Sequence, residues 1–143
     1  MKHTSQLLTG LAELMQEANL GVYRPDGTVK DYETGIFLHR MPEGPDKAYA
    51  LTPYPVEDTG LTDVIDAVQI RMRAGMDPLE VSDMADAVRD LLHMRENTWF
   101  GELRASLIWR QSQAPMGQDT HGREELTSNY YVRSTRLSDH VHD

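Results

Sequence analysis

The stretch from Asp63 to Met94 constrains the fold most, because it reads as a strand followed directly by a helix. Its first part shows the two-residue period of a half-buried strand. Gly75 then ends the run, so we predict one strand with one face in the core. The apolar even positions are Val64, Val68, Ile70 and Met72, and the polar odd positions are Gln69, Arg71 and Arg73.

A helix is predicted immediately after this strand. Asp77 can accept hydrogen bonds from the first free N–H groups of a helix, Pro78 suits the first helical position, and Glu80 stands where a capping box has its acid. Beyond this start, apolar residues recur at helical spacing and charged residues fill the other side. The apolar positions are Val81, Met84, Ala85, Val88, Leu91 and Leu92, and the polar ones are Glu80, Asp83, Asp86, Arg89, Asp90 and His93.

The remaining elements follow from apolar patterns and turn residues. A first helix is expected from a cap at Thr4 or Ser5 to Ala18, with Gly21 as its C-terminal signal. Pro53 and Pro55 cannot donate to a sheet ladder and place the end of their strand at an edge or in a loop. Further strands are predicted at Val22–Tyr23, Gly35–Arg40, Lys47–Thr52, Leu103–Arg110 and Thr127–Arg136, loops at Thr28–Thr34 and Gln113–Leu126, and a short connection at Asn97–Gly101.

The order α-β-β-β-α-β-β predicts an α+β domain, with a mostly antiparallel sheet of four to five strands and two helices packed on one face. The 143 residues suit a single domain over residues 1–136, followed by a polar, histidine-rich tail over residues 137–143 that we expect to be loose. No secretion signal or membrane span is visible, so we expect a soluble protein made in the cytoplasm.

Charge and composition exclude several functions. The formal net charge of −9 argues against a DNA- or RNA-binding surface, because such surfaces gain affinity from Lys and Arg. The absence of cysteine excludes disulfides, thiolate metal sites and cysteine catalysis. We also find no nucleophile motif and no phosphate-binding loop.

The histidines and aspartates make weak catalytic candidates. His140 and His142, flanked by Asp139 and Asp143, resemble a metal-binding tail, but no third fixed ligand is in view. The acidic helix positions named above face solvent, whereas acid/base catalysis needs a desolvated carboxyl group. We therefore predict no enzyme, no cofactor and no metal site. A small metal-dependent enzyme that uses the histidines is the least favoured alternative.

A set of arginines on the predicted strands would form a basic stripe if the strands are adjacent. One interpretation is ordinary pairing with acids such as Asp66 and Glu102. The other is contact with the acidic helix face of a neighbouring copy, which would give a head-to-tail ring. Trp109, Tyr130 and Tyr131 are expected to be core or hairpin residues first and interface anchors second. The stripe comprises Arg71, Arg73, Arg104, Arg110, Arg133 and Arg136, and the candidate subunit interface comprises Arg71, Arg73, Asp83, Asp86, Asp90, Arg104 and Arg133.

Several short strings of the chain, taken together, resemble the small minor capsid or tail terminator proteins of siphophages that infect actinobacteria. Each string is short and structural, and their specificity comes from their order along Gln6–Arg136. The departure from the family pattern is the tail, Leu137–Asp143, for which the resemblance implies no role. The strings are Leu20–Tyr23, Thr34–Ile36, Ala50–Val56, Val68–Arg73, Met84–His93, Ser106–Ser112, Pro115–Asp119 and Asn129–Arg133.

The resemblance implies a virion subunit without catalytic residues, assembled in the host cytoplasm. It implies a homo-oligomeric ring, a hexamer, at the tail–neck junction, which stops tail-tube growth, caps the tail tube protein and meets the head-closure or connector protein. DNA would pass the acidic lumen without specific binding, and no membrane would be involved. The alternative in the same virion is a head-closure or tail-completion subunit. Candidate docking loops are Thr28–Thr34 and Gln113–Leu126, the latter with Met116, Gln118, Asp119, His121 and Arg123.

Overall fold

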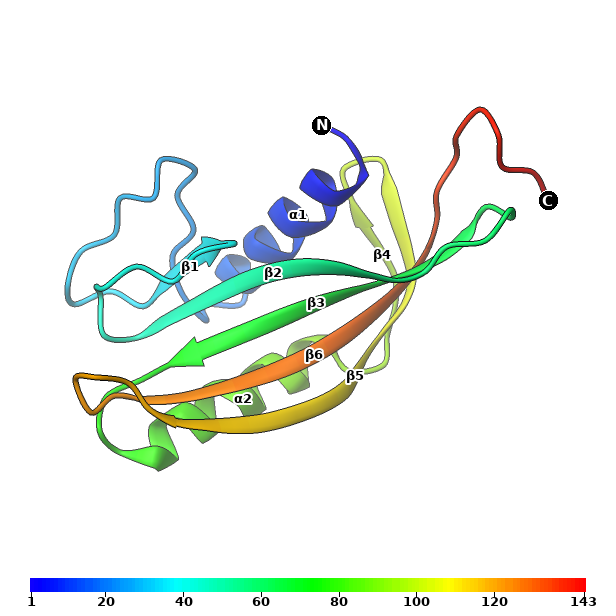
Figure 1. Ribbon diagram of the computed structural model, residues 1–143. Helices are drawn as coiled ribbons and strands as arrows, with labels where there is room; N and C mark the ends of the chain where they lie inside the picture. The colour runs from blue at the N-terminus through cyan, green and yellow to red at the C-terminus, as the bar shows by residue number, and fades with distance from the viewer.

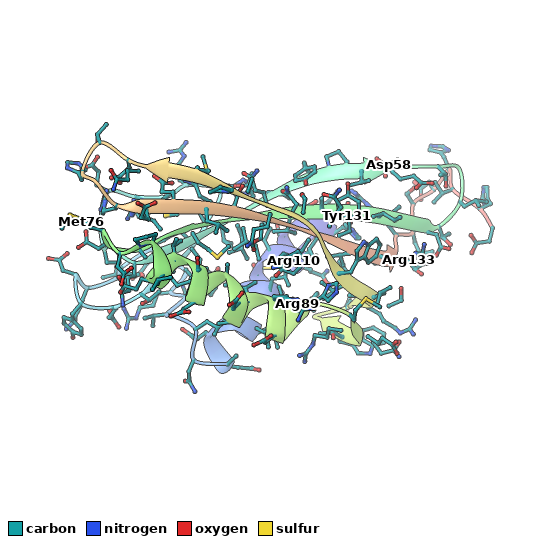
Figure 2. All side chains as sticks on the ribbon, turned by 90° about the horizontal axis from the view of Figure 1, so that it is seen from below. Asp58, Met76, Arg89, Arg110, Tyr131 and Arg133 are labelled. Carbon is teal, nitrogen blue, oxygen red and sulfur yellow. The ribbon has the colours of Figure 1, made fainter.

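A six-stranded sheet forms one layer of the protein, and two helices pack together on one of its faces (Figures 1 and 2). The computed structural model describes all residues, 1–143. The elements in chain order are α1 (His3–Glu17), β1 (Gly35–Leu38), β2 (Ala48–Glu57), β3 (Asp63–Arg73), α2 (Pro78–Leu92), β4 (Arg95–Phe100), β5 (Leu103–Gln118) and β6 (Glu124–Thr135). The strand order is β1-β2-β3-β6-β5-β4, and all neighbouring pairs are antiparallel except β1 and β2.

The predicted α+β class and the placement of both helices on one face are confirmed, whereas four to five strands is too few. The missed strand is β4, which includes most of the stretch expected to be a short connection. Its side chains are mostly exposed, and Asn97 has a left-handed backbone with φ of 49°. An exposed edge strand of this kind has no alternating apolar pattern, which is the signal that sequence reasoning uses.

The strand and helix that organise the sequence are confirmed. β3 buries Val68, Ile70 and Met72, and α2 begins at Pro78 with the Asp77 side chain accepting a hydrogen bond from the Leu79 N–H at 3.0 Å. The carboxylate of Glu80 pairs with Lys47, before β2, instead of completing a capping box. This ion pair ties the first turn of α2 to the sheet.

Helix α1 begins and ends earlier than predicted. Its N-cap is Lys2, which makes no side-chain cap, so Thr4 and Ser5 lie inside the helix. At the other end Asn19, with φ of 62°, takes the left-handed position that was assigned to Gly21. Asparagine tolerates this conformation better than most residues because its short polar side chain bonds locally. Neither helix combines the length and the apolar composition that crossing a bilayer would require.

The long loop predicted at Gln113–Leu126 is wrong, because most of this stretch is a β-hairpin. β5 and β6 pair as far as Gln118 and Glu124, and the turn between them is short. The pairing shifts register between Pro115 and Gly117, where Gly117 has φ of 79°. Proline and glycine therefore mark a β-bulge here, and not a loop, on the part of β5 that extends beyond its pairing with β4.

The open edge of β2 is shielded by proline, as predicted. The carbonyls of Lys47 and Leu51 accept hydrogen bonds from the β1 side, so the backbone alternation turns Pro53 and Pro55 toward the same side beyond the end of β1. Neither residue has an N–H group to offer there. This edge consequently lacks the donors that a further strand would need.

The C-terminal segment, expected to be loose, contacts the loop between β2 and β3. The carboxylate of Asp143 accepts hydrogen bonds from the N–H and the hydroxyl of Thr62 at 3.1 and 2.6 Å. The N–H of His142 donates to the Gly60 carbonyl at 2.9 Å. These bonds to Thr62 hold the pKa of Asp143 below its usual value.

Helix α1 closes the curled sheet, because it contacts β1 and β2 near one margin and β4 at the other (Figure 1). Three register shifts along β5 accompany this curl, as expected for bulged strands, which bend. The closest approach is at Gly10, where an added Cβ would lie 2.4 Å from the Phe100 Cβ. A core of 23 buried residues fills the space between the sheet and both helices.

Replacing Gly10 with alanine tests this close approach. Glycine inside a helix usually costs about 0.5–1 kcal/mol relative to alanine, so a helix without this contact would gain stability. We expect Gly10→Ala instead to lower the free energy of unfolding by about 1–3 kcal/mol in urea denaturation, because the methyl group overpacks against Phe100. The control Glu13→Ala, at an exposed position of α1, should change it by less than about 0.5 kcal/mol. A gain in stability for Gly10→Ala would contradict this packing.

Candidate assembly surfaces

The histidines and acidic residues are dispersed over the structure. No group of three or more metal-ligating side chains is placed to hold an ion. Three histidines instead contact other elements: His3 bonds to Asp66 at 2.6 Å, His93 Nδ1 accepts from the Arg110 N–H at 2.9 Å, and His121 lies 3.7 Å from a Glu43 oxygen. The surfaces of the molecule therefore carry the candidate functional features.

The first surface is the outer face of α2, directed away from the sheet (Figure 2). It presents the predicted aspartates Asp83, Asp86 and Asp90, all exposed. Asp83 and Asp86 form no ion pair, and Asp90 lies 3.8 Å from its neighbour Arg89. The opposite side of the helix is buried in the core, so this stripe of negative charge faces solvent with only Arg89 beside it.

The second surface is the open face of the sheet, defined as the face opposite the helices. Arg133 lies there on β6 and is exposed, and Arg71 lies on β3, where it pairs with Glu125 of β6. Arg104, on β5, is also exposed and donates to the Asn97 side chain. The open face thus retains cationic groups, although fewer than the sequence suggested.

Arg73 does not belong to an exposed stripe, which corrects the prediction for this residue. It is 3% exposed and donates hydrogen bonds to the backbone carbonyls of Pro42, Pro45 and Asp46. An arginine fork suits such a set of acceptors because its five donors have a fixed geometry. Arg73 therefore anchors the loop before β2, and its sequence position gave no sign of this role.

The turn between β5 and β6 is anchored in a similar way by Arg123. Its guanidinium donates to the Asp119 carboxylate at 2.8 Å, to the Glu43 carbonyl at 2.7 Å and to Asp46 at 3.2 Å. Burial alone would raise the pKa of Asp119, but hydrogen bonds from the backbone N–H groups of Arg123 and His121 and from the guanidinium lower it to about 2. Asp119 and Arg123, two of the five predicted docking residues, therefore hold the turn together. The other three, Met116, Gln118 and His121, are exposed at the hairpin end.

Trp109, Tyr130 and Tyr131 lie in the core or on the β5–β6 hairpin, as predicted. Tyr130 is fully buried in the core. Tyr131 and Trp109 lie on the β5–β6 hairpin, on the open face of the sheet, edge to face, with ring centroids 5.6 Å apart. Tyr54, which sequence analysis did not single out as a site residue, lies on the same face, and its hydroxyl donates to Asn129 at 3.0 Å. Sheet register was the missing information, since it brings together residues far apart in the chain.

These features define a small α+β protein with two uncovered faces of different character. The family model of the bacteriophage tail terminator protein matches residues 14–136, so the chain belongs to the bacteriophage tail terminator protein family. It is accordingly a structural virion protein of the phage tail.

The fold also occurs in a solved virion. A chain of the virion of a native gene transfer agent particle superimposes with a TM-score of 0.64 at 14% sequence identity, and the match covers 90% of this chain and 94% of that chain. At 14% sequence identity, this similarity shows that the two chains share a fold. No curated protein sequence matches the chain.

The anchoring of the β5–β6 turn predicts a pH dependence. Because the pKa of Asp119 is lowered from 3.8 to about 2 in the folded protein, its contribution to stability is present above about pH 4 and is lost as the pH falls toward about 2. Asp119→Asn should therefore be less stable than wild type at pH 7. The difference in the free energy of unfolding should shrink as the pH falls from about 4 toward about 2. Urea denaturation at several pH values measures it, with Glu13→Gln as a control at an exposed carboxylate. A difference that does not change with pH would contradict the role of the charge.

Proposed function

We propose that the protein assembles into a hexameric ring that caps the head-proximal end of the tail tube. In this position it would stop tube growth, contact the last ring of tail tube protein and offer its other side to the head-closure or connector protein. Membership of the tail terminator family supports the role, and the fold shared with a virion chain is consistent with it. The observation that carries the ring is that one subunit presents unlike faces on opposite sides.

A ring needs a head-to-tail contact, in which two different surfaces of the subunit meet. The outer face of α2, with Asp83, Asp86 and Asp90, lies on one side of the molecule, and the open face, with Arg71, Arg104 and Arg133, lies on the other. Such complementarity steers association and fixes orientation more than it adds affinity. Copies related in this way form a chain of subunits. The chain closes into a ring when the rotation between successive copies divides a full turn evenly.

The remaining surfaces suit contacts along the tail axis. Met116, Gln118 and His121 protrude at the end of the β5–β6 hairpin, and the Thr28–Thr34 segment forms a loop elsewhere on the surface. We propose that these two regions contact the neighbouring rings. The net charge of −9 fits a lumen that DNA crosses without being held, because an acidic wall repels phosphate.

The first test is the oligomeric state of the purified protein. Light scattering coupled to size exclusion should give the mass of six copies, and negative-stain imaging should show a closed ring with a central hole. Asp86→Arg should reduce the assembled fraction, because it places a like charge against the open face, whereas Glu13→Arg on α1 should leave it unchanged. Protein that remains monomeric at every concentration would contradict a self-assembling ring and favour a head-closure subunit. Assembly that is insensitive to Asp86→Arg would exclude the acidic face from the contact.

A further inference from the structure

The open face carries a line of aromatic side chains that the sheet register creates. Tyr54 of β2 lies opposite Ala67 of β3, Ala67 lies opposite Tyr131 of β6, and Tyr131 lies opposite Trp109 of β5. We call Tyr54, Tyr131 and Trp109 the aromatic row. Adjacent strands are about 4.8 Å apart, so four strands give a row about 14 Å across.

The row is held in place by contacts within the sheet. Trp109 packs edge to face on Tyr131, and the hydroxyl of Tyr54 is fixed by Asn129. Ala67 between them is fully buried, so its small side chain is covered and the flanking rings form the surface of the row. Side chains that are already fixed lose little entropy when a partner binds.

A sheet face that only meets solvent is normally polar, since water solvates its outward side chains. Here the row is apolar and aromatic, with Ile65 and Leu107 opposite Arg133 in the neighbouring row. Tyrosine, tryptophan and arginine are the residues enriched at the energetic centres of protein interfaces. This part of the open face therefore has the composition of an interface centre.

We propose that the aromatic row seats the outer face of α2 from a second copy of the chain, an inference that rests on the proposed ring. Charge selects this partner. Two open faces in contact would bring Arg133 toward Arg133, and two helix faces would bring the aspartates together, so both symmetric arrangements are repulsive. Only the open face against the helix face opposes unlike charges.

The shape and chemistry of α2 fit the row. Its 15 residues form a rod about 22 Å long and about 10 Å wide, which is long enough to span the row of about 14 Å. Its outer stripe has the aspartates in the middle and Leu79, 69% exposed, in the first turn, and Met94, 57% exposed, follows the C-cap of the helix. A methionine sulfur contacts aromatic rings favourably. These apolar ends can cover the aromatic row while the aspartates meet the arginines.

The chain has no cysteine, which permits site-specific cross-linking. Ser82→Cys places a thiol on the exposed side of α2. Gln69→Cys places one on β3 opposite Thr52 and Asn129, two residues along the strand from Ala67 of the row. With a short bismaleimide, the double variant should give a ladder of covalent oligomers, a mixture of the two single variants should stop at dimers, and neither single variant alone should cross-link. Dimers from one single variant would show a symmetric contact and overturn the proposal.

A second measurement addresses the aromatic row itself. Trp109→Ala should raise the concentration for half-assembly on the order of tenfold or more, as for a residue at an interface centre. Tyr32→Ala is the control, because Tyr32 is 83% exposed and lies in the segment between α1 and β1, outside the sheet. Equal effects of the two substitutions would overturn the role of the row.

The two proposals fail in different ways. If wild type forms an oligomer but the double variant does not cross-link, the proposed ring survives and the contact between α2 and the aromatic row is wrong. If wild type forms no oligomer and the double variant does not cross-link, both are overturned.

Discussion

One-sided coverage of the sheet is the constraint on which the rest of this structure depends. Both helices lie in the concave side of the curled sheet, and α1 reaches both margins only because Gly10 lets it approach Phe100. Most of the buried apolar side chains of the strands thereby lie on that side. The convex side has no helix to cover it, so its composition is set by solvent and by whatever protein it meets.

Arginine has two different roles in this chain. Arg73 and Arg123 satisfy backbone carbonyls of the segment that precedes β2, and their removal would leave buried acceptors without donors. Arg104 and Arg133 make no ion pair and remain at the surface. Arginine thus serves both purposes: Arg73 and Arg123 fix the segment that precedes β2, whereas Arg104 and Arg133 are available at the surface.

The sequence predicted the parts of the fold with strong local signals. β3 and α2 have a clear period and a capped start, and both lie where expected. β4 and the outer half of β5 were missed because exposed edge strands have no apolar alternation, and Pro115 and Gly117 suggested a loop where the structure has a bulge. Of the candidate surfaces, the acidic stripe was predictable from helical spacing. The aromatic row was not, because it depends on strand order, and the burial of Arg73 depends on a loop distant in sequence.

The prolines at the edge of β2 have a consequence for how copies can associate. A bare strand edge can template the same backbone ladder in molecule after molecule, and crowding at a site where many copies gather would favour open-ended fibres. With Pro53 and Pro55 on that edge, growth by backbone pairing is disfavoured there. Self-recognition is left to side chains, whose fitted shapes fix the angle between neighbours. A fixed angle between neighbours lets an assembly close after a set number of copies.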